Sequence, residues 1–250
     1  MKDLGPLQYF LGLEVQITST GTLLHQHKYT QEVISLADLQ SGNYVLTPLE
    51  QVSQFMQAPR HLHLAAVCRI VRYLKGTSTR GLFFPKESSL QLVGYSDADW
   101  AECADTRRSV TGWCMFLGNA LISWKSKKQD RVSKSSTESE YRAMSSACFE
   151  ITWLRGLLGE LGFPQLHSTP LHADNTSAIQ IAANPVFRER TKHIEVDCHS
   201  IRESFDRHVI TLPHISTKHQ TADIFTKALS RHRYQFLVDK LMLLDPPASI

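Results

Sequence analysis

Long apolar runs are missing from this chain of 250 residues, and none approaches the roughly 20 residues that a helix needs to cross a bilayer. The opening residues, 1–6, lack the basic start and the apolar centre of a signal peptide. Cysteine is scarce as well: the five cysteines are odd in number and scattered, with no close pair to form a zinc knuckle. These absences predict an intracellular protein, cytoplasmic or nuclear and not secreted, with free thiols and no contact with a membrane.

A strong excess of charge is also absent. The formal net charge is +3, charged residues make up 20% of the chain and apolar residues 42%, which is the profile of a soluble globular protein. Net charge alone therefore does not indicate nucleic-acid binding. The distribution is more informative, because basic residues gather near a short acidic stretch: Arg107, Arg108, Lys125, Lys127, Lys128, Arg131 and Lys134.

Hydrophobic periodicity predicts an alternation of strands and helices. In the first third we expect a hairpin over 7–24 with Gly21 in its turn, a helix over 29–37 capped by Thr30 or a neighbour, and a helix over 61–75. The predicted strands that follow are 90–95, 109–117, 121–125, 171–173 and 209–215, with a hairpin turn at Gly118-Asn119. The predicted helices are 136–161, 175–183, 189–207 and 221–243. This order favours a mixed α/β sheet flanked by helices.

The most informative stretch is Gly94-Tyr95-Ser96-Asp97-Ala98-Asp99-Trp100-Ala101, which follows an apolar run. Residues i and i+2 of a strand point to the same face, so Asp97 and Asp99 could both face one site. Acidic residues near a strand end favour divalent-metal chemistry, and ordinary turn chemistry is the alternative.

Four acids lie at or beside the ends of predicted elements, and together they form a candidate metal-ligand set: Asp97, Glu140, Asp174 and Asp223. Singly, Glu140 and Asp223 could complement helix dipoles, and Asp174 could form an Asx turn or an N-cap. If the four converge, they need cations, since like charges about 4 Å apart cost on the order of 4 kcal/mol at an effective dielectric near 20. Oxygen ligands favour two Mg²⁺ ions, with Mn²⁺ as a substitute, over zinc. Spacing alone does not show that the four meet.

Several motifs in order resemble the ribonuclease H domain of copia-type LTR retrotransposon Pol polyproteins. Besides the stretch at 94–101, they are Ser123-Trp124-Lys125-Ser126-Lys127-Lys128-Gln129, Ser135-Ser136-Thr137-Glu138-Ser139-Glu140-Tyr141-Arg142-Ala143, Ala173-Asp174-Asn175, Arg190-Thr191-Lys192-His193-Ile194 and Thr221-Ala222-Asp223-Ile224-Phe225-Thr226-Lys227. The resemblance implies a ribonuclease H-like mixed five-stranded sheet flanked by helices. It also implies two-metal hydrolysis of the RNA strand of an RNA/DNA hybrid, with no small-molecule cofactor.

The family's catalytic and metal-binding acids fall on Asp97, Glu140, Asp174 and Asp223. The resemblance selects Asp97 over Asp99 and Glu140 over Glu138; on a helix Glu138 and Glu140 lie about 200° apart, so only one can face the metals. A histidine that assists product release falls on His214 or His219, and the choice stays open. Nucleic-acid contacts are expected from the hairpin residues and two others: Lys125, Lys127, Lys128, Arg131, Asn175 and Lys192.

The N-terminal part resembles the end of a reverse transcriptase palm and its connection. We expect a palm remnant with an internal deletion over 1–60, a connection helix and linker over 61–90, the ribonuclease H domain over 91–243 and a tail over 244–250. The deletion is inferred because Thr47-Pro48-Leu49-Glu50 runs almost directly into Gln51-Val52-Ser53-Gln54-Phe55-Met56. No Asp-Asp dipeptide occurs, so DNA synthesis is not expected, and residues 1–60 are predicted to be partly disordered or loosely docked.

The sequence thus predicts a hybrid-specific ribonuclease within a truncated retrotransposon polyprotein that lacks polymerase activity. The alternative, favoured by the deletion, is a catalytically silent retroelement relic that at most binds nucleic acid. The oligomeric state does not follow from the sequence.

Overall fold

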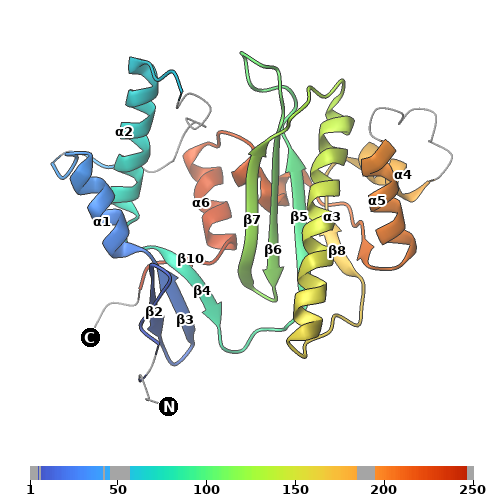
Figure 1. Cartoon of the computed structure of the whole chain (residues 1–250), viewed down its shortest axis with the longest axis horizontal. Helices are drawn as coiled ribbons and strands as arrows, with labels where there is room; N and C mark the ends of the chain where they lie inside the picture. The colour runs from blue at the N-terminus through green and yellow to red at the C-terminus, as the bar shows by residue number, and fades with distance from the viewer. Residues whose placement is uncertain (1–4, 6, 42, 46–56, 185–194, 247–250) are drawn as a thin grey trace. The chain divides into compact units, whose positions relative to one another are not determined.

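The structure is a computed structural model that describes residues 5, 7–41, 43–45, 57–184 and 195–246, with only the backbone of 195–198 (Figure 1). The chain divides into two compact units. One comprises Met1–Glu87 with Ala228–Ile250, and the other comprises Ser88–Lys227. Within the described ranges, no helix is both long enough and apolar enough to span a membrane.

The Ser88–Lys227 unit is built on a five-stranded sheet with the order β7-β6-β5-β8-β9. Its strands are β5 (Leu92–Ala98), β6 (Val110–Leu117), β7 (Ala120–Lys128), β8 (Thr169–His172) and β9 (Ile210–Thr211). The first three pair antiparallel, whereas β5, β8 and β9 run parallel. The sheet is therefore mixed, and the α/β architecture expected from the sequence is confirmed.

Helices cover this sheet and bury its core. They are α3 (Ser136–Glu160), α4 (Thr176–Ala183) and α5 (Glu195–Asp206), followed by the short 3₁₀ turns η4 (Thr217–His219) and η5 (Thr221–Phe225). Figure 1 shows α3 lying along the sheet with α5 next to it. Met144 and Ile151 of α3 are fully buried against Met115 and Leu171 of the strands, so the apolar stripe of the long helix forms the centre of the core.

Two strands are longer than predicted. Strand β5 continues past Tyr95 to Ala98 because its antiparallel pairing with β6 continues, and Asp97 consequently lies inside a strand, opposite Gly112. Strand β7 likewise runs on to Lys128. The hairpin turn between β6 and β7 falls at Gly118-Asn119 as expected, with Gly118 at a φ of +60° that suits glycine.

The predicted helix over 221–243 is wrong as a single element. Residues Thr221–Phe225 form η5, and a separate helix, α6 (Arg231–Lys240), begins after Ser230, whose side chain accepts from Arg233 N–H. The predicted strand over 209–215 is reduced to β9 and one parallel bridge between Ala173 and His214. The predicted helix over 189–207 is seen as α5, and 189–194 lie outside the described residues.

The other unit holds a second five-stranded sheet, with the order β1-β2-β3-β4-β10. Its elements are β1 (Tyr9–Phe10), β2 (Leu13–Ile17), β3 (Gly21–His25), α1 (His27–Leu36), α2 (His61–Gly76), β4 (Gly81–Pro85), α6 and β10 (Leu243–Leu244). The expected hairpin and both helices are present. Gly21, however, begins β3 instead of lying in the turn, and Gln26 instead of Thr30 precedes α1.

The unit boundaries differ from the domain ranges expected from the sequence. Residues 228–250 group with 1–87, since β10 pairs with β4, whereas the sequence had assigned 228–243 to the nuclease domain. The expected deletion point, within 46–56, lies outside the described residues.

Candidate metal centre

Three of the four predicted acids converge. Carboxylate oxygens of Asp97, Glu140 and Asp174 all lie within 4.8 Å of one another. The sheet register explains the meeting of the two aspartates: β5 and β8 are parallel with Tyr95 opposite His172, so the residues two positions further on emerge side by side. Glu140 joins them from the N-terminal part of α3, whose start is fixed by the Ser135 N-cap.

The cluster is rich in carboxylates, of which Asp97 and Glu140 are buried and Asp174 is half-buried. Burial, and then the neighbouring charges of Asp97 and Asp174, raise the pKa of Glu140 to about 9. Burial also raises the pKa of Asp97, although Lys227 and a hydrogen bond from Thr226 act in the opposite direction. Among the described residues, nothing donates a hydrogen bond to the buried Oε2 of Glu140. An oxygen-only set with an unsatisfied buried carboxylate oxygen fits a hard divalent cation.

Asp223 lies outside this group of three and is joined to it through a lysine. Lys227 Nζ is 2.8 Å from Oδ1 of Asp223 and 3.1 Å from Oδ1 of Asp97. Burial would lower the pKa of Lys227, but the two carboxylates outweigh it and raise that pKa above its ordinary value. Sequence reasoning assigned no role to Lys227; its spacing of four residues from Asp223 is the signal that could have indicated the pair.

A close approach of η5 to strand β6 completes the surroundings of Asp97. The Thr226 hydroxyl donates a hydrogen bond to Oδ2 of Asp97, and Lys227 contacts Oδ1. Opposite Asp97 on β6, a Cβ atom at Gly112 would lie 2.5 Å from the Thr226 methyl carbon and 3.1 Å from the Ala222 carbonyl oxygen. Gly112 is therefore required for this approach, and neither it nor Thr226 was singled out from the sequence.

Asp99 and Glu138, the two acids that were not selected as metal ligands, do not belong to the cluster of three carboxylates. Asp99 accepts a hydrogen bond from the Val110 backbone N–H, and burial, followed by the charge of Glu102, raises the pKa of Asp99 to about 7. Glu138 accepts from Lys134 N–H at 2.7 Å and from Arg142 Nη2 at 2.6 Å. Glu138 thus fixes the start of α3.

Both candidate histidines lie near Asp174 in the fold. His214 pairs with Ala173, the residue before Asp174, and is exposed. His219 ends η4, the turn in which the Thr217 hydroxyl donates to Oδ2 of Asp174 at 2.8 Å. The geometry leaves the choice between the two open.

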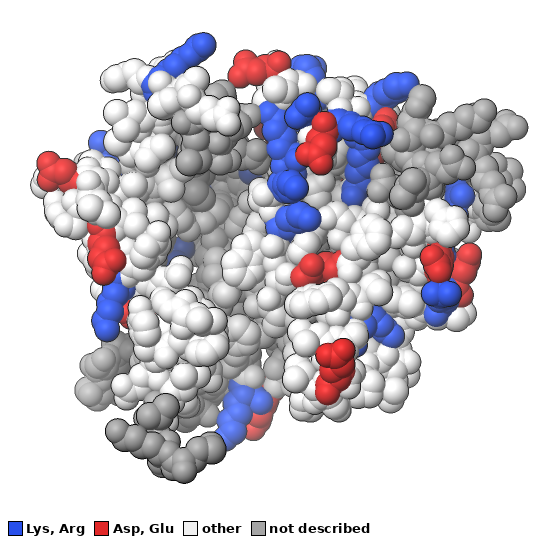
Figure 2. Space-filling model, in the orientation of Figure 1, with Lys and Arg blue, Asp and Glu red and all other residues white. Residues whose placement is uncertain are grey.

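A basic surface accompanies the acidic cluster in the same unit. A pocket of about 320 Å³ lies between β7 and α3, with five cationic residues in its wall: Lys125, Lys127, Lys128, Arg131 and Arg142. Figure 2 shows lysines and arginines gathered over this region. Arg142 was not among the predicted contacts. Of the remaining predicted contacts, Asn175 caps α4 by accepting from Ala178 N–H at 2.9 Å, and Lys192 lies outside the described residues.

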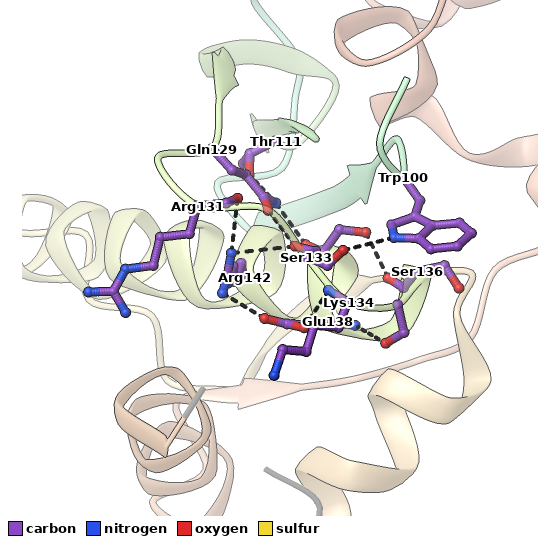
Figure 3. A network of polar contacts seen from close by, with 11 residues as sticks. Trp100, Thr111, Gln129, Arg131, Ser133, Lys134, Ser136, Glu138 and Arg142 are labelled. Atoms are coloured by element: carbon purple, nitrogen blue, oxygen red, sulfur yellow. Dashed lines mark hydrogen bonds and ion pairs between the residues drawn. The ribbon is translucent and has the colours of Figure 1, made fainter. Parts of the chain in front are cut away.

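The connection between β7 and α3 is held by a polar network (Figure 3). Gln129 donates to Thr111 Oγ1 and to the Ser139 carbonyl oxygen, and it accepts from the Ser133 hydroxyl. The Ser133 carbonyl oxygen in turn accepts from the indole N–H of Trp100 at 3.2 Å, while 54% of Trp100 stays exposed. The network therefore fixes the position of the connection, which lines the basic pocket, relative to the start of α3.

The fold and the cluster define an α/β domain with a candidate site for divalent cations. No family model matches the chain. Over its whole length the chain is 35% identical to the retrovirus-related Pol polyprotein from transposon RE1 of Arabidopsis thaliana, and over 94% of its length it is 32% identical to that from transposon TNT 1-94 of Nicotiana tabacum. It is also 35% identical, over 61% of its length, to the uncharacterized mitochondrial protein AtMg00810 of Arabidopsis thaliana, of which it covers 80%.

Retrovirus-related Pol polyproteins of transposons are therefore homologues of this chain. The chain spans about a fifth of the length of these transposon relatives: 20% of RE1 and 21% of TNT 1-94. Among solved structures it is similar to LC11-RNase H1, with a TM-score of 0.43 and 13% identity over 55% of this chain and 93% of that one. It is also similar to the foamy viral protease-reverse transcriptase in complex with RNA/DNA hybrid, with a TM-score of 0.39 and 15% identity over 83% of this chain and 29% of that one.

Proposed function

We propose that the Ser88–Lys227 unit is a ribonuclease H of the copia type that hydrolyses the RNA strand of RNA/DNA hybrids. The observation that carries the proposal is the convergence of Asp97, Glu140 and Asp174 within 4.8 Å. Two buried carboxylates and one half-buried carboxylate, with a raised pKa at Glu140, form a site whose charge divalent cations would compensate; Mg²⁺ is the expected ion and Mn²⁺ a substitute.

In this proposal the acidic residues bind the cations and a histidine assists the release of product. Asp97, Glu140 and Asp174 would hold the cations, and Asp223 completes the set through its position beside Asp97. When bound, a pair of divalent ions would supply the Lewis-acid chemistry for phosphodiester hydrolysis, which would leave 3′-hydroxyl and 5′-phosphate ends. The exposed His214 or His219 would assist the departure of product.

The basic pocket between β7 and α3 would hold the phosphate backbone of the hybrid. Its five cations offer salt-dependent phosphate contacts, and recognition of RNA would come from 2′-hydroxyl groups in the minor groove. Asn175, beside Asp174, and Lys192 are proposed as further nucleic-acid contacts. Because none of these groups is assigned to a base edge, we expect cleavage with little base preference.

Cleavage of a labelled RNA/DNA hybrid in Mg²⁺ or Mn²⁺ tests the proposal. The wild-type chain should cut the RNA strand, and Asp97→Asn and Asp174→Asn should each lower the rate by about a thousandfold or more, since several kcal/mol of charge stabilisation is lost with the cation. Glu160→Gln removes an exposed carboxylate from α3 and serves as the control. A folded wild-type chain, checked by circular dichroism, that leaves the hybrid intact would refute the proposal.

The second candidate is a catalytically silent retroelement relic that retains nucleic-acid binding. It is favoured by the alignment with RE1, which runs over 290 residues and so includes positions of the relative that this chain of 250 residues lacks. The absence of an Asp-Asp dipeptide also argues against polymerase activity. For a relic, wild type, Asp97→Asn and Asp174→Asn would show equal and negligible cleavage while hybrid binding persists.

A further inference from the structure

Lys227 places a positive charge between two carboxylates of the site. The backbone N–H of Lys227 donates to the Asp223 carbonyl oxygen at 3.1 Å, and its Nζ lies 2.8 Å from Oδ1 of the same residue. The same Nζ reaches Oδ1 of Asp97 at 3.1 Å. The side chains of Asp97 and Asp223 are 0% and 5% exposed, whereas that of Lys227 is 33% exposed, so the ammonium group reaches inward from the surface.

Asp97 consequently belongs to two groups of charges. With Glu140 and Asp174 it forms the cluster of three carboxylates, and Lys227 contacts that cluster at Asp97. With Asp223 it forms a second pair of carboxylates, and there the Lys227 ammonium supplies the compensating charge. Two buried carboxylates without a counter-ion are strongly disfavoured, so the lysine stabilises the pair in the metal-free protein.

We propose that Lys227 is the resident counter-ion of the Asp97–Asp223 pair and that it sets the order in which divalent ions bind. This inference rests on the metal centre of the proposed function. The first ion enters the cluster of Asp97, Glu140 and Asp174, and a second ion at Asp97 and Asp223 binds only when the ammonium leaves. Lys227 is a positioning residue in this scheme.

The chemistry of lysine suits this role. Its ammonium group is a compact point charge on a flexible stem, and the part-exposed stem of Lys227 allows the group to move into solvent. Repulsion between an ammonium group and a divalent ion at contact distance weakens the binding of the second ion until the lysine departs. A chain with a neutral residue at this position should therefore bind the second ion more tightly.

Isothermal titration calorimetry of Mn²⁺ into the metal-free full chain, without nucleic acid, measures this order. Wild type should bind one ion at the tighter site and a second ion weakly. Lys227→Gln should tighten the second site by about tenfold or more and leave the first site nearly unchanged. Lys227→Arg, which keeps the charge, should behave like wild type, and Lys86→Gln, which removes an exposed lysine from the other unit, controls for net charge.

A second measurement uses the wild-type chain and does not depend on the folding of any variant. Acylation of lysine amines, followed by mass spectrometry, should modify Lys227 slowly in the metal-free protein, because its ammonium group is held by two carboxylates. Saturating Mn²⁺ should raise the rate at Lys227 severalfold and leave the rate at exposed Lys86 unchanged. Identical Mn²⁺ isotherms for wild type and Lys227→Gln, or an acylation rate at Lys227 that Mn²⁺ does not raise, would overturn the role of Lys227 alone. A wild-type chain that binds no Mn²⁺ would overturn the metal centre as well.

Discussion

Replacing Glu140 by glutamine should stabilise the metal-free protein. Glu140 is almost completely buried, and burial together with Asp97 and Asp174 raises its pKa from 4.5 to about 9. At pH 7 the folded chain therefore retains a proton on Glu140 that the unfolded chain releases. The raised pKa of Glu140 lowers the free energy of unfolding by about 1.4 kcal/mol for each pH unit above the unfolded pKa. At pH 7 this amounts to about 3 kcal/mol.

The sign of the pH dependence follows from the same shift. The contribution of Glu140 is absent below its unfolded pKa of 4.5, and between there and about 9 the folded state binds more protons, so stability falls as pH rises. Glu140→Gln removes the titration while keeping the shape of the side chain. The variant should exceed wild type by about 1 kcal/mol or less near pH 5 and by about 3 kcal/mol at pH 7.

Urea unfolding in the presence of a chelator, at pH 5 and pH 7, is the assay. Glu160 is exposed on the same helix, so Glu160→Gln is the control. Its free energy of unfolding should change between pH 5 and pH 7 by the same amount as that of wild type. The reasoning fails if Glu140→Gln shows the same loss of stability from pH 5 to pH 7 as wild type.

Three further predictions concern the surroundings of the cluster. Gly112→Ala should destabilise the protein by about 1–3 kcal/mol in urea unfolding, because the new methyl group overlaps η5, whereas Gly156→Ala, with open space on α3, should not destabilise. Arg142→Gln should cost about 1–3 kcal/mol, because it leaves the buried Glu138 carboxylate without its cation; equal stability would contradict this role. Lys127→Ala should weaken hybrid binding and lower the slope of log affinity against log salt by roughly one, while Lys127→Arg should restore both, as fluorescence anisotropy can measure.

The elements that carry the cluster could be predicted because their signals are local. The apolar run before Asp97, the long helical periodicity around Glu140 and the short strand before Asp174 each have a pattern that does not depend on distant residues. Helix geometry allows only one of Glu138 and Glu140 to face the site, and the family resemblance selects Glu140. The structure explains Glu138 separately through its hydrogen bonds with Lys134 and Arg142.

The contacts of η5 could not be predicted, because they join residues far apart in the chain. Thr226 is 129 positions from Asp97, and their hydrogen bond exists only because Gly112 lets η5 approach strand β6. The same contacts explain why residues 221–243 do not form one helix. Thr226 and Lys227 form hydrogen bonds with Asp97, and the next helix, α6, begins only after Ser230. Tertiary hydrogen bonds here override local helix propensity.

The most direct test of the central claim is the position of Mn²⁺ in crystals of the full chain, read from anomalous scattering at the manganese edge. The account predicts a strong peak within coordination distance of Asp97, Glu140 and Asp174, and loss of that peak in Asp174→Asn crystals. Manganese bound elsewhere, with these three carboxylates bearing no ion at saturating Mn²⁺, would contradict it.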